Sequence, residues 1–343
     1  MLKIVLESLG KFAIREIPQP VLTDPHSVLI QVAFVGICGS DIHYYKSGRI
    51  GDQVIKYPFT PGHECTGIVS QTGSAVRNVK AGDRVVIEPA IHCGKCDQCL
   101  SGRKHTCRHL QFIGNPVDRD GCLQSFIVVP ETCCYQLPES VSLQTGIMVE
   151  PLTIALHALS FKKNPGHTAI LGLGPIGIST LLALKPNSDD KIMVTDKLDT
   201  RFKRAEEIGV DAFWNPGKTD VVSELLRVEP LGMDTVIECC GEQEALDQAV
   251  KIIKPGGTLI VVGIPETGKI DFDLHALRRK EVSIFNVRRQ NENFIEAIER
   301  LSDNIAVWEN LVTHQFTGPD VQKAFDLVAG YQDNVLKAVI RLM

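Results

Sequence analysis

The sequence lacks an excess of positive charge, a long apolar run and any internal repeat. Its formal net charge is −5 and its pI is near 6.1, which argues against a general nucleic-acid surface. The longest apolar stretch, residues 168–184, is short for a membrane span and is interrupted by glycines. Residues 1–17 carry five charges and so lack the apolar region of a signal peptide. We expect a cytoplasmic protein that binds neither nucleic acid nor membrane.

What is present indicates about two domains, because 343 residues exceed what one hydrophobic core usually supports. With 44% hydrophobic and 22% charged residues, the composition is that of an ordinary globular protein. The segment before residue 92 contains short strand-like runs separated by Gly, Asp and Pro, the clearest at 28–32, 67–70 and 84–87. This pattern predicts a small all-β barrel or sandwich, to which a strand-like run at 123–129 adds.

From residue 153 the pattern changes to alternating helix-like and strand-like runs. The strand-like runs lie at 169–171, 192–195, 210–213, 234–238, 258–262 and 282–285, with helices such as 200–208, 221–227 and 242–253 between them. Six strands alternating with helices predict an α/β fold with a doubly wound parallel sheet. The tail adds helices at 294–301 and 321–328, a strand at 311–315 and a closing strand at 337–342. We expect that strand to pair with the first domain.

A glycine-rich turn follows the first strand of this sheet. Gly172, Gly174 and Gly177 form Gly-x-Gly-x-x-Gly, completed by Pro175 and Ile176, and Asp196 lies 19 positions beyond the last glycine. This spacing is typical of a dinucleotide site, where a helix N-terminus faces the pyrophosphate and the acid accepts hydrogen bonds from the ribose. Asp196 would repel a 2′-phosphate and so favours NAD, although Arg201 weakens that preference. The strand ends at Gly241, Val262 and Gly263 are expected to line the same site.

Four of the eleven cysteines are close together, at positions 93, 96, 99 and 107. Four local thiolates can surround one tetrahedral ion, so we expect Cys93, Cys96, Cys99 and Cys107 to hold a structural zinc. Free thiols or an iron–sulfur cluster are the alternatives, since short cysteine spacings also occur in such clusters. A closed site with four sulfurs leaves no position for substrate, so its role would be stability.

A second group of possible metal ligands is spread along the first 150 residues. It comprises Cys38, His63, Glu64 and Glu150. Taken singly, these could be a buried thiol, a core histidine and an acid at a helix start. Together, one sulfur, one imidazole and a carboxylate suit a zinc ion with an open position for substrate, which is the catalytic arrangement.

At this point the sequence resembles the zinc-dependent medium-chain dehydrogenase/reductase family. The similarity rests on 36-GICGSDIHY-44, 61-PGHE-64, 81-AGDRV-85, the cysteine group, 149-VEPL-152 and the glycine turn, which occur in family order over nearly the whole chain. It implies a Rossmann domain, residues 151–286, inserted into a GroES-like β-barrel catalytic domain made of residues 1–150 and 287–343. The structural zinc would occupy a lobe at about residues 90–110. The family also implies a homo-oligomer, with a tetramer favoured over a dimer.

Within the family the sequence is most similar to polyol dehydrogenases (sorbitol, xylitol and L-iditol). The resemblance implies two zinc ions per subunit and transfer of hydride from a secondary alcohol to NAD. Ser40 and then His43 would carry the alcohol proton to solvent, and Tyr44 and Arg289 would contact substrate. We expect Cys38, His63 and Glu64 as ligands of the catalytic zinc, with Glu150 as an alternating ligand or water holder.

One motif departs from the family pattern. Polyol dehydrogenases carry an Arg-Tyr pair after the last strand of the inserted domain, whereas here Gln290 follows Arg289. The preceding Arg288 suggests a sugar acid as an alternative substrate, and L-threonine 3-dehydrogenase and butanediol dehydrogenase activities are further alternatives. A zinc-free relative without catalysis is disfavoured by the intact ligand group, and a zinc-ribbon nucleic-acid binder is disfavoured by the acidic net charge.

Overall fold

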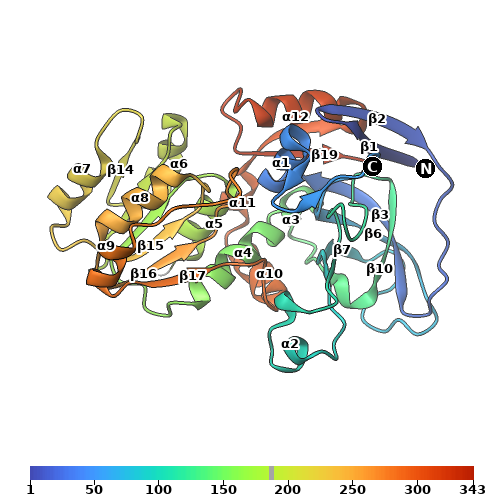
Figure 1. Ribbon diagram of the computed structural model, residues 1–343. Coiled ribbons are helices and arrows are strands. Elements are labelled where there is room, and N and C mark those ends of the chain that lie inside the picture. Colours follow the sequence, from blue (N-terminus) through green and yellow to red (C-terminus); the bar gives the residue numbers. More distant parts are fainter. Residues whose placement is uncertain (185–188) are drawn as a thin grey trace. The chain divides into compact units, whose positions relative to one another are not determined.

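The computed structural model describes residues 1–184 and 189–343, which form two compact units. The split unit consists of residues 1–153 and 291–343, and the inserted unit consists of residues 154–290. Both chain ends lie in the split unit (Figure 1). Within the described ranges, every helix is too short or too polar to cross a lipid bilayer.

The split unit is built around one seven-stranded sheet. The strands follow the order β11-β7-β6-β3-β19-β18, and β10 also pairs with β3. Their bounds are Ser27–Gly36 (β3), Glu64–Thr72 (β6), Arg84–Ile87 (β7), Phe126–Pro130 (β10), Cys134–Gln136 (β11), Val312–Thr317 (β18) and Lys337–Arg341 (β19). A hairpin of β1 (Leu2–Ser8) and β2 (Lys11–Glu16) and the two-stranded pairs β4–β5 (Arg49–Ile50, Gln53–Val54) and β8–β9 (Ala90–Ile91, Gln111–Phe112) complete the strands.

The closing strand joins the two ends of the chain. Val339 of β19 pairs with Gly36 of β3, so the final strand returns to the first part of the chain as expected. One hydrophobic core contains buried residues from both ends, among them Ile30, Phe325 and Ile340. Because apolar burial supplies most of the stabilisation of such a core, neither end can complete it alone.

Seven helices lie wholly or partly in the split unit as described. They are α1 (Gly39–Ser47), α2 (Asp97–Leu100), α3 (Leu143–Gly146), α4 (Val149–Ser160), α10 (Phe294–Asp303), α11 (Ile305–Glu309) and α12 (Val321–Ala329). The sequence predicts the start of α4 at residue 153, but the helix begins at Val149 and therefore includes Glu150 in its first turn. A proline at the third helical position explains the difference, because Pro151 needs no intrahelical hydrogen-bond partner there.

The inserted unit is the predicted doubly wound parallel sheet. Its order is β14-β13-β12-β15-β16-β17, with all pairs parallel. The strands are Thr168–Leu171 (β12), Ile192–Thr195 (β13), Ala212–Trp214 (β14), Met233–Glu238 (β15), Ile253–Val261 (β16) and Ser283–Asn286 (β17). The helices are Pro175–Ala183 (α5), Phe202–Ile208 (α6), Val221–Val228 (α7), Gln243–Ile252 (α8) and Leu274–Lys280 (α9). The direction of winding reverses between β12 and β15, which is where such sheets bind ligands.

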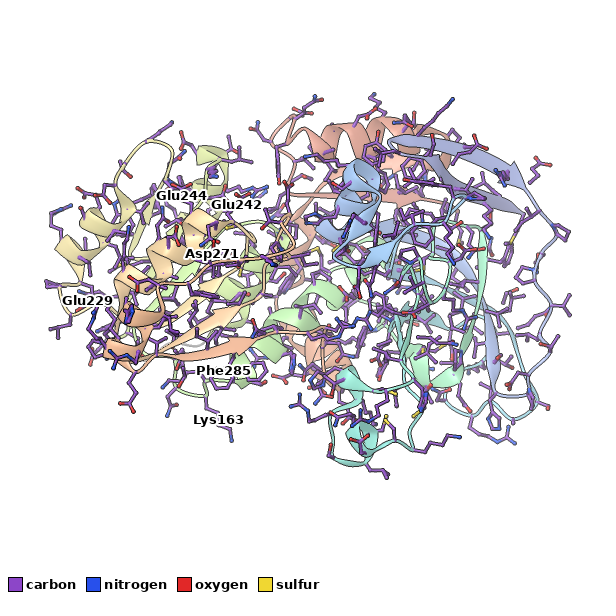
Figure 2. All side chains as sticks on the ribbon, viewed as in Figure 1. Lys163, Glu229, Glu242, Glu244, Asp271 and Phe285 are labelled. Atoms are coloured by element: carbon purple, nitrogen blue, oxygen red, sulfur yellow. The ribbon has the colours of Figure 1, made fainter. Side chains whose placement is uncertain are left out.

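Aromatic packing fixes the outer strand of this sheet. Phe285 of β17 stacks on Phe161, with ring centroids 5.0 Å apart, and Figure 2 labels Phe285 at this edge. Phe161 directly follows α4, so the contact fixes the end of that helix against the sheet.

Candidate active site and metal centres

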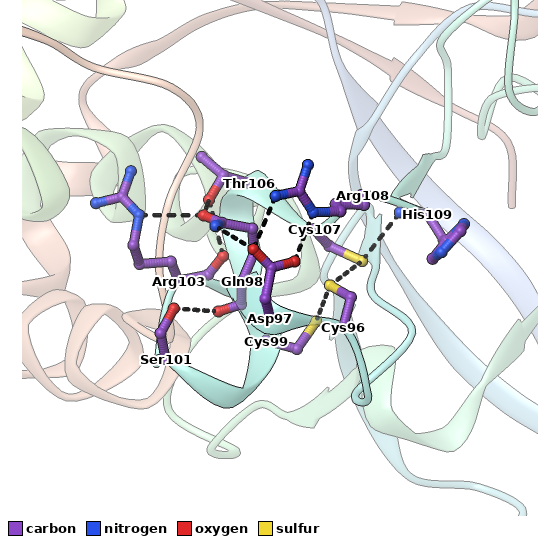
Figure 3. A network of polar contacts seen from close by, with 10 residues as sticks. All are labelled: Cys96, Asp97, Gln98, Cys99, Ser101, Arg103, Thr106, Cys107, Arg108 and His109. Carbon is purple, nitrogen blue, oxygen red and sulfur yellow. Dashed lines mark hydrogen bonds and ion pairs between the residues drawn. The ribbon is translucent and has the colours of Figure 1, made fainter.

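The four cysteines of the predicted structural site converge as expected. Their sulfurs all lie within 4.8 Å of one another, and among the described residues they are the one such group of three or more possible ligands. The Cys96 sulfur lies 3.6 Å from that of Cys99 and 3.8 Å from that of Cys107 (Figure 3). A tetrahedron with zinc–sulfur bonds of about 2.3 Å places its sulfurs about 3.8 Å apart. These distances fit a zinc ion.

Backbone N–H groups in this cysteine lobe stabilise the thiolate form of Cys96. Hydrogen bonds from the backbone N–H of Cys99 and of Arg108 lower the pKa of the Cys96 thiol to about 6. The thiolate is the form that binds metal, so this shift favours binding near neutral pH. Arg108 also forms a two-pronged ion pair with Asp97, at 2.5 and 2.8 Å, which ties the two ends of the lobe together (Figure 3).

Cys38 and His63 meet in the split unit. Cys38 is the residue before α1, and His63 directly precedes β6. Asp41 connects them: its Oδ2 accepts the N–H of Cys38 at 3.1 Å, and its Oδ1 accepts the N–H of Gly62 at 3.0 Å. Asp41 is buried, and its Oδ1 lies 3.7 Å from His63 Nδ1. The carboxylate therefore fixes both candidate ligands relative to each other.

The environment of His63 is that of a cation site. Burial alone would lower the pKa of His63, but the neighbouring Asp41 and Cys38 outweigh it and hold this pKa well above the usual range. Nδ1 is buried and faces Asp41 Oδ1 at 3.7 Å, just beyond hydrogen-bond distance. A buried imidazole beside a thiol, with a carboxylate at one ring nitrogen, suits a metal ligand, so these residues fit a zinc ion.

Glu64 occupies the position after His63 but is held by a lysine. Lys337 Nζ lies 2.7 Å from Glu64 Oε1 and 2.6 Å from Oε2, and both side chains are only 1% exposed. Lys337 also donates to the carbonyl of Ile37 at 3.3 Å. The carboxylate lies over Gly36, where a Cβ atom would come 2.2 Å from Oε2. The glycine before Ile37 thus makes room for this pair.

Glu150 lies in the same electrostatic environment. Its side chain is 4% exposed, and burial raises its pKa to about 7, with the nearby charge of His63 acting in the opposite direction and that of Glu64 adding to the rise. Glu150 can therefore hold or release a proton near neutral pH. Which of the two glutamates binds the ion remains a prediction, and the contact of Glu64 with Lys337 favours Glu150.

The predicted proton carriers and the first substrate residue lie on α1. Ser40 and His43 are three positions apart, so they project from one side of the helix, and both are partly exposed. Tyr44 is buried, donates its hydroxyl to Gln53 Oε1 at 3.3 Å, and packs edge-on against Phe59. The relay and the substrate contact remain predictions.

The glycine turn has the geometry that a dinucleotide site requires. Gly172 has a φ of +96°, and a Cβ at Gly177 would lie 1.9 Å from the Gly172 carbonyl oxygen. Gly174 immediately precedes α5, whose first residues are Pro175 and Ile176. The start of α5 therefore packs closely against the turn after β12, and its first N–H groups are available to a phosphate.

Asp196 is bound to this turn. Its Oδ2 accepts the N–H of Leu173 at 2.7 Å and Nη1 of Arg201 at 3.0 Å, and its Oδ1 accepts the N–H of Leu198 at 2.7 Å. A carboxylate has about four acceptor positions, so one remains for a ribose hydroxyl. Arg201 forms an ion pair with Asp196. This pairing explains how an acidic and a basic residue can both lie at one cofactor site.

The remaining predicted residues also belong to the inserted unit. Gly241 and Gly263 lie at the ends of β15 and β16, and a Cβ at Gly263 would meet the Gly241 nitrogen at 2.1 Å. Val262 follows β16 and its N–H bonds to the Glu238 carbonyl at 2.8 Å. Arg289 has a φ of +55° and is partly exposed, and its contact with substrate remains a prediction.

Sequence reasoning missed three residues of these sites: Asp41, Lys337 and Glu238. A local signal existed for Asp41 alone, because it lies three positions after Cys38 in the first turn of α1, where an acid accepts free N–H groups. Lys337 is the first residue of a strand whose next three residues are apolar, and only the fold places it beside Glu64.

The fold and these sites define a zinc-dependent dehydrogenase with a GroES-like and a Rossmann-like domain. Residues 24–139 match the family model of the alcohol dehydrogenase GroES-like domain, and residues 175–303 match that of the zinc-binding dehydrogenases. Sorbitol dehydrogenase of Bacillus subtilis is 33% identical over 339 residues, which cover 98% of this chain and 96% of that protein. The chain belongs to the zinc-dependent medium-chain dehydrogenase/reductase family.

Solved structures agree with this assignment. A crystal structure from Escherichia coli of an oxidoreductase/dehydrogenase of unknown specificity superposes with a TM-score of 0.91 at 32% identity, covering 100% of this chain and 99% of that one. An Escherichia coli alcohol dehydrogenase in complex with NADH gives a TM-score of 0.87 at 28% identity, covering 100% and 99%. The chain is therefore an oxidoreductase of alcohols that uses zinc and a nicotinamide cofactor.

Proposed function

We propose that this protein oxidises a secondary alcohol of a polyol to a ketone, with NAD as the hydride acceptor. The observation that carries the proposal is the burial of Asp41, His63, Glu64 and Glu150, with His63 beside Cys38 and Glu150 within the electrostatic reach of His63 and Glu64. Sulfur, imidazole and carboxylate in one protected place are the donors of a catalytic zinc. The similarity to a sorbitol dehydrogenase supports a polyol as substrate.

Two zinc ions per subunit follow from the two ligand groups. Cys38 and His63 would hold the catalytic ion together with Glu64 or Glu150, and the cysteine lobe would hold the other. A zinc ion at the first site would supply Lewis acidity, which lowers the pKa of an alcohol oxygen. Asp41 keeps the His63 ring oriented, and Glu150 accepts or returns a proton near pH 7.

The proton released by the alcohol needs a path to water. We assign Ser40 Oγ as the first acceptor and the His43 imidazole as the second, because they share one side of α1 and both are partly exposed. NAD would accept the hydride from the alcohol carbon. The backbone N–H groups at the start of α5 and the remaining acceptor position of Asp196 would hold its adenosine half.

The substrate is tested by a panel assayed with NAD and with NADP. We expect sorbitol and xylitol with NAD to give the highest kcat/KM, and a zinc chelator to abolish the NADH signal. L-Threonine, 2,3-butanediol and a sugar acid of the same carbon number are the competing arms. Faster turnover of the sugar acid would indicate that Arg289 binds the carboxylate of the substrate. Equal efficiency with NADP would refute the role given to Asp196.

The oligomeric state is part of the proposal. Among the described strands β17 lies at one end of the inserted sheet, and an open edge offers unpaired backbone groups to a second copy. We propose a homo-oligomer, with a tetramer favoured, and light scattering at assay concentration measures its mass. A cytoplasmic location stays a prediction from the sequence.

A further inference from the structure

A buried carboxylate lies where the inserted sheet reverses its winding. Glu238 is the last residue of β15, and it pairs with Leu171, the last residue of β12, and with Val261 of β16. Its side chain is fully buried. The carboxyl ends of these strands border the dinucleotide crevice, so Glu238 lies directly beneath the predicted cofactor site.

One oxygen of this carboxylate shapes the next turn. Oε1 accepts the N–H groups of Cys240 and Gly241, both at 2.6 Å. Gly241 has a φ of +75°, so the turn depends on a glycine and on an acceptor that faces two consecutive N–H groups. The other oxygen, Oε2, is buried and has no hydrogen-bond partner among the described residues.

The neighbouring loop packs on the same carboxylate. A Cβ at Gly263, in the loop after β16, would lie 2.7 Å from Glu238 Oε2 and 2.1 Å from the Gly241 nitrogen. A Cβ at Gly172 would lie 2.9 Å from the Cys240 Cβ. Three strand ends therefore meet here with almost no side-chain space between them, and the Glu238 carboxyl group lies among them.

We propose that Glu238 is a positioning residue for the nicotinamide half of the cofactor. A buried carboxylate with an unmatched oxygen costs stability, so apolar packing does not explain it. Its effect is to fix the turn 239–241 against the loop of Gly263. Of the two mononucleotide-binding halves of such a sheet, the Asp196 half takes the adenosine and the half of β15 and β16 takes the nicotinamide nucleoside.

The inference rests on the proposed function, and its test separates the two. The zinc-loaded enzyme is titrated calorimetrically with AMP and with NADH, for the wild type, Glu238→Ala, Glu238→Gln and Gly263→Ala. We expect Glu238→Ala to weaken NADH binding by at least about tenfold, because two hydrogen bonds to a charged acceptor are lost, and to leave AMP binding unchanged. Gly263→Ala should give the same pattern, because its Cβ displaces the turn.

Glu238→Gln serves as the rescue, since the amide oxygen can still accept both N–H groups. Its NADH affinity should lie within about threefold of the wild type. Asp234→Ala is the matched control: Asp234 lies at the opposite end of the same strand, accepts the His167 N–H at 3.0 Å and pairs with Lys254. It should lower the melting temperature and leave the ratio of NADH to AMP affinity unchanged.

Three outcomes would refute either the proposed function or the positioning role of Glu238. A wild type that binds no NADH refutes the proposed function. A wild type that binds NADH, with Glu238→Ala binding NADH equally well or losing AMP in the same proportion, refutes only the positioning role. A Glu238→Gln enzyme as weak as Glu238→Ala also refutes it, because the turn would then depend on charge and not on the acceptor.

Discussion

Lys337 and Glu64 form a fully buried ion pair, in which Nζ lies within 2.7 Å of both carboxylate oxygens although the residues are 273 positions apart. Glu64 directly follows His63 in the chain. Burial disfavours the ammonium form, but the charges of Glu64, Cys38 and Glu150 outweigh it and raise the pKa of Lys337. The lysine therefore stays charged and supplies the compensating positive charge of the candidate catalytic site.

Removing this lysine should destabilise the protein strongly. In Lys337→Met, Glu64 is left as a buried carboxylate without a counter-ion, and we expect the free energy of unfolding to fall by about 3–5 kcal/mol. Guanidinium denaturation of the zinc-loaded enzyme measures the change. The double variant Glu64→Gln, Lys337→Met should recover much of the loss, because neither charge remains.

The exposed pair of Arg15 and Glu7 provides the control for this prediction. Its side chains are 43% and 47% exposed, so Arg15→Ala should change the free energy of unfolding by less than about 1 kcal/mol. An equal effect of Lys337→Met and Arg15→Ala would mean that burial does not decide the strength of the Glu64 pair.

Glu150 should make the stability of the metal-free protein depend on pH. Burial raises its pKa from 4.5 to about 7, so below pH 4.5 folded and unfolded chains both carry the proton and the full stabilisation is present. As pH rises through 7 the folded chain must ionise a buried group, and up to about 3 kcal/mol is lost. Urea denaturation at intervals from pH 5 to 8, with chelator present, measures this loss. Glu150→Gln should remove that part of the pH dependence, and identical profiles for both proteins would contradict the assignment.

Cys96→Ser should remove the metal of the cysteine lobe. We expect the zinc content to fall from two to one per chain, because the lowered pKa of Cys96 marks it as a thiolate ligand and the remaining three sulfurs cannot close a tetrahedron. Elemental analysis after gel filtration gives the count. Cys240→Ser is the control, since Cys240 is exposed and belongs to neither ligand group, and it should retain both ions.

Asp196→Ser should shift the cofactor preference toward NADP. The substitution removes the charge that repels a 2′-phosphate and releases Arg201 from its 3.0 Å contact. We expect the ratio of kcat/KM for NAD to that for NADP to fall by at least about tenfold. Asp199→Ala provides the control, because Asp199 is about half-exposed and bonds to Asn215, outside the glycine turn. A ratio that moves equally in both variants would mean that general surface charge sets the preference.

Local sequence patterns predicted most of the strands, helices and candidate sites, whereas the remaining contacts depend on pairing between distant strands. The glycine turn and the cysteine lobe each lie within a short stretch of chain, so spacing alone indicated their geometry. The contact of Glu64 with Lys337 depends on β19 pairing beside β3, which no local pattern encodes. The sequence also predicts the fifth strand of the inserted sheet from residue 258, whereas β16 begins at Ile253. Ile253 pairs with Met233 and Thr258 with Thr235, so residues 254–257 form an irregularity within β16, and Gly256 there has a φ of +74°.

The closing strand has a consequence for synthesis on the ribosome. Residues 154–290 are complete before β19 is made, so the inserted unit can fold while Glu64 still lacks its lysine. The candidate zinc site gains its full charge balance only when the last few residues emerge and β19 pairs with β3. A nascent chain stalled before Lys337 would therefore carry a finished nucleotide domain and an unfinished metal site.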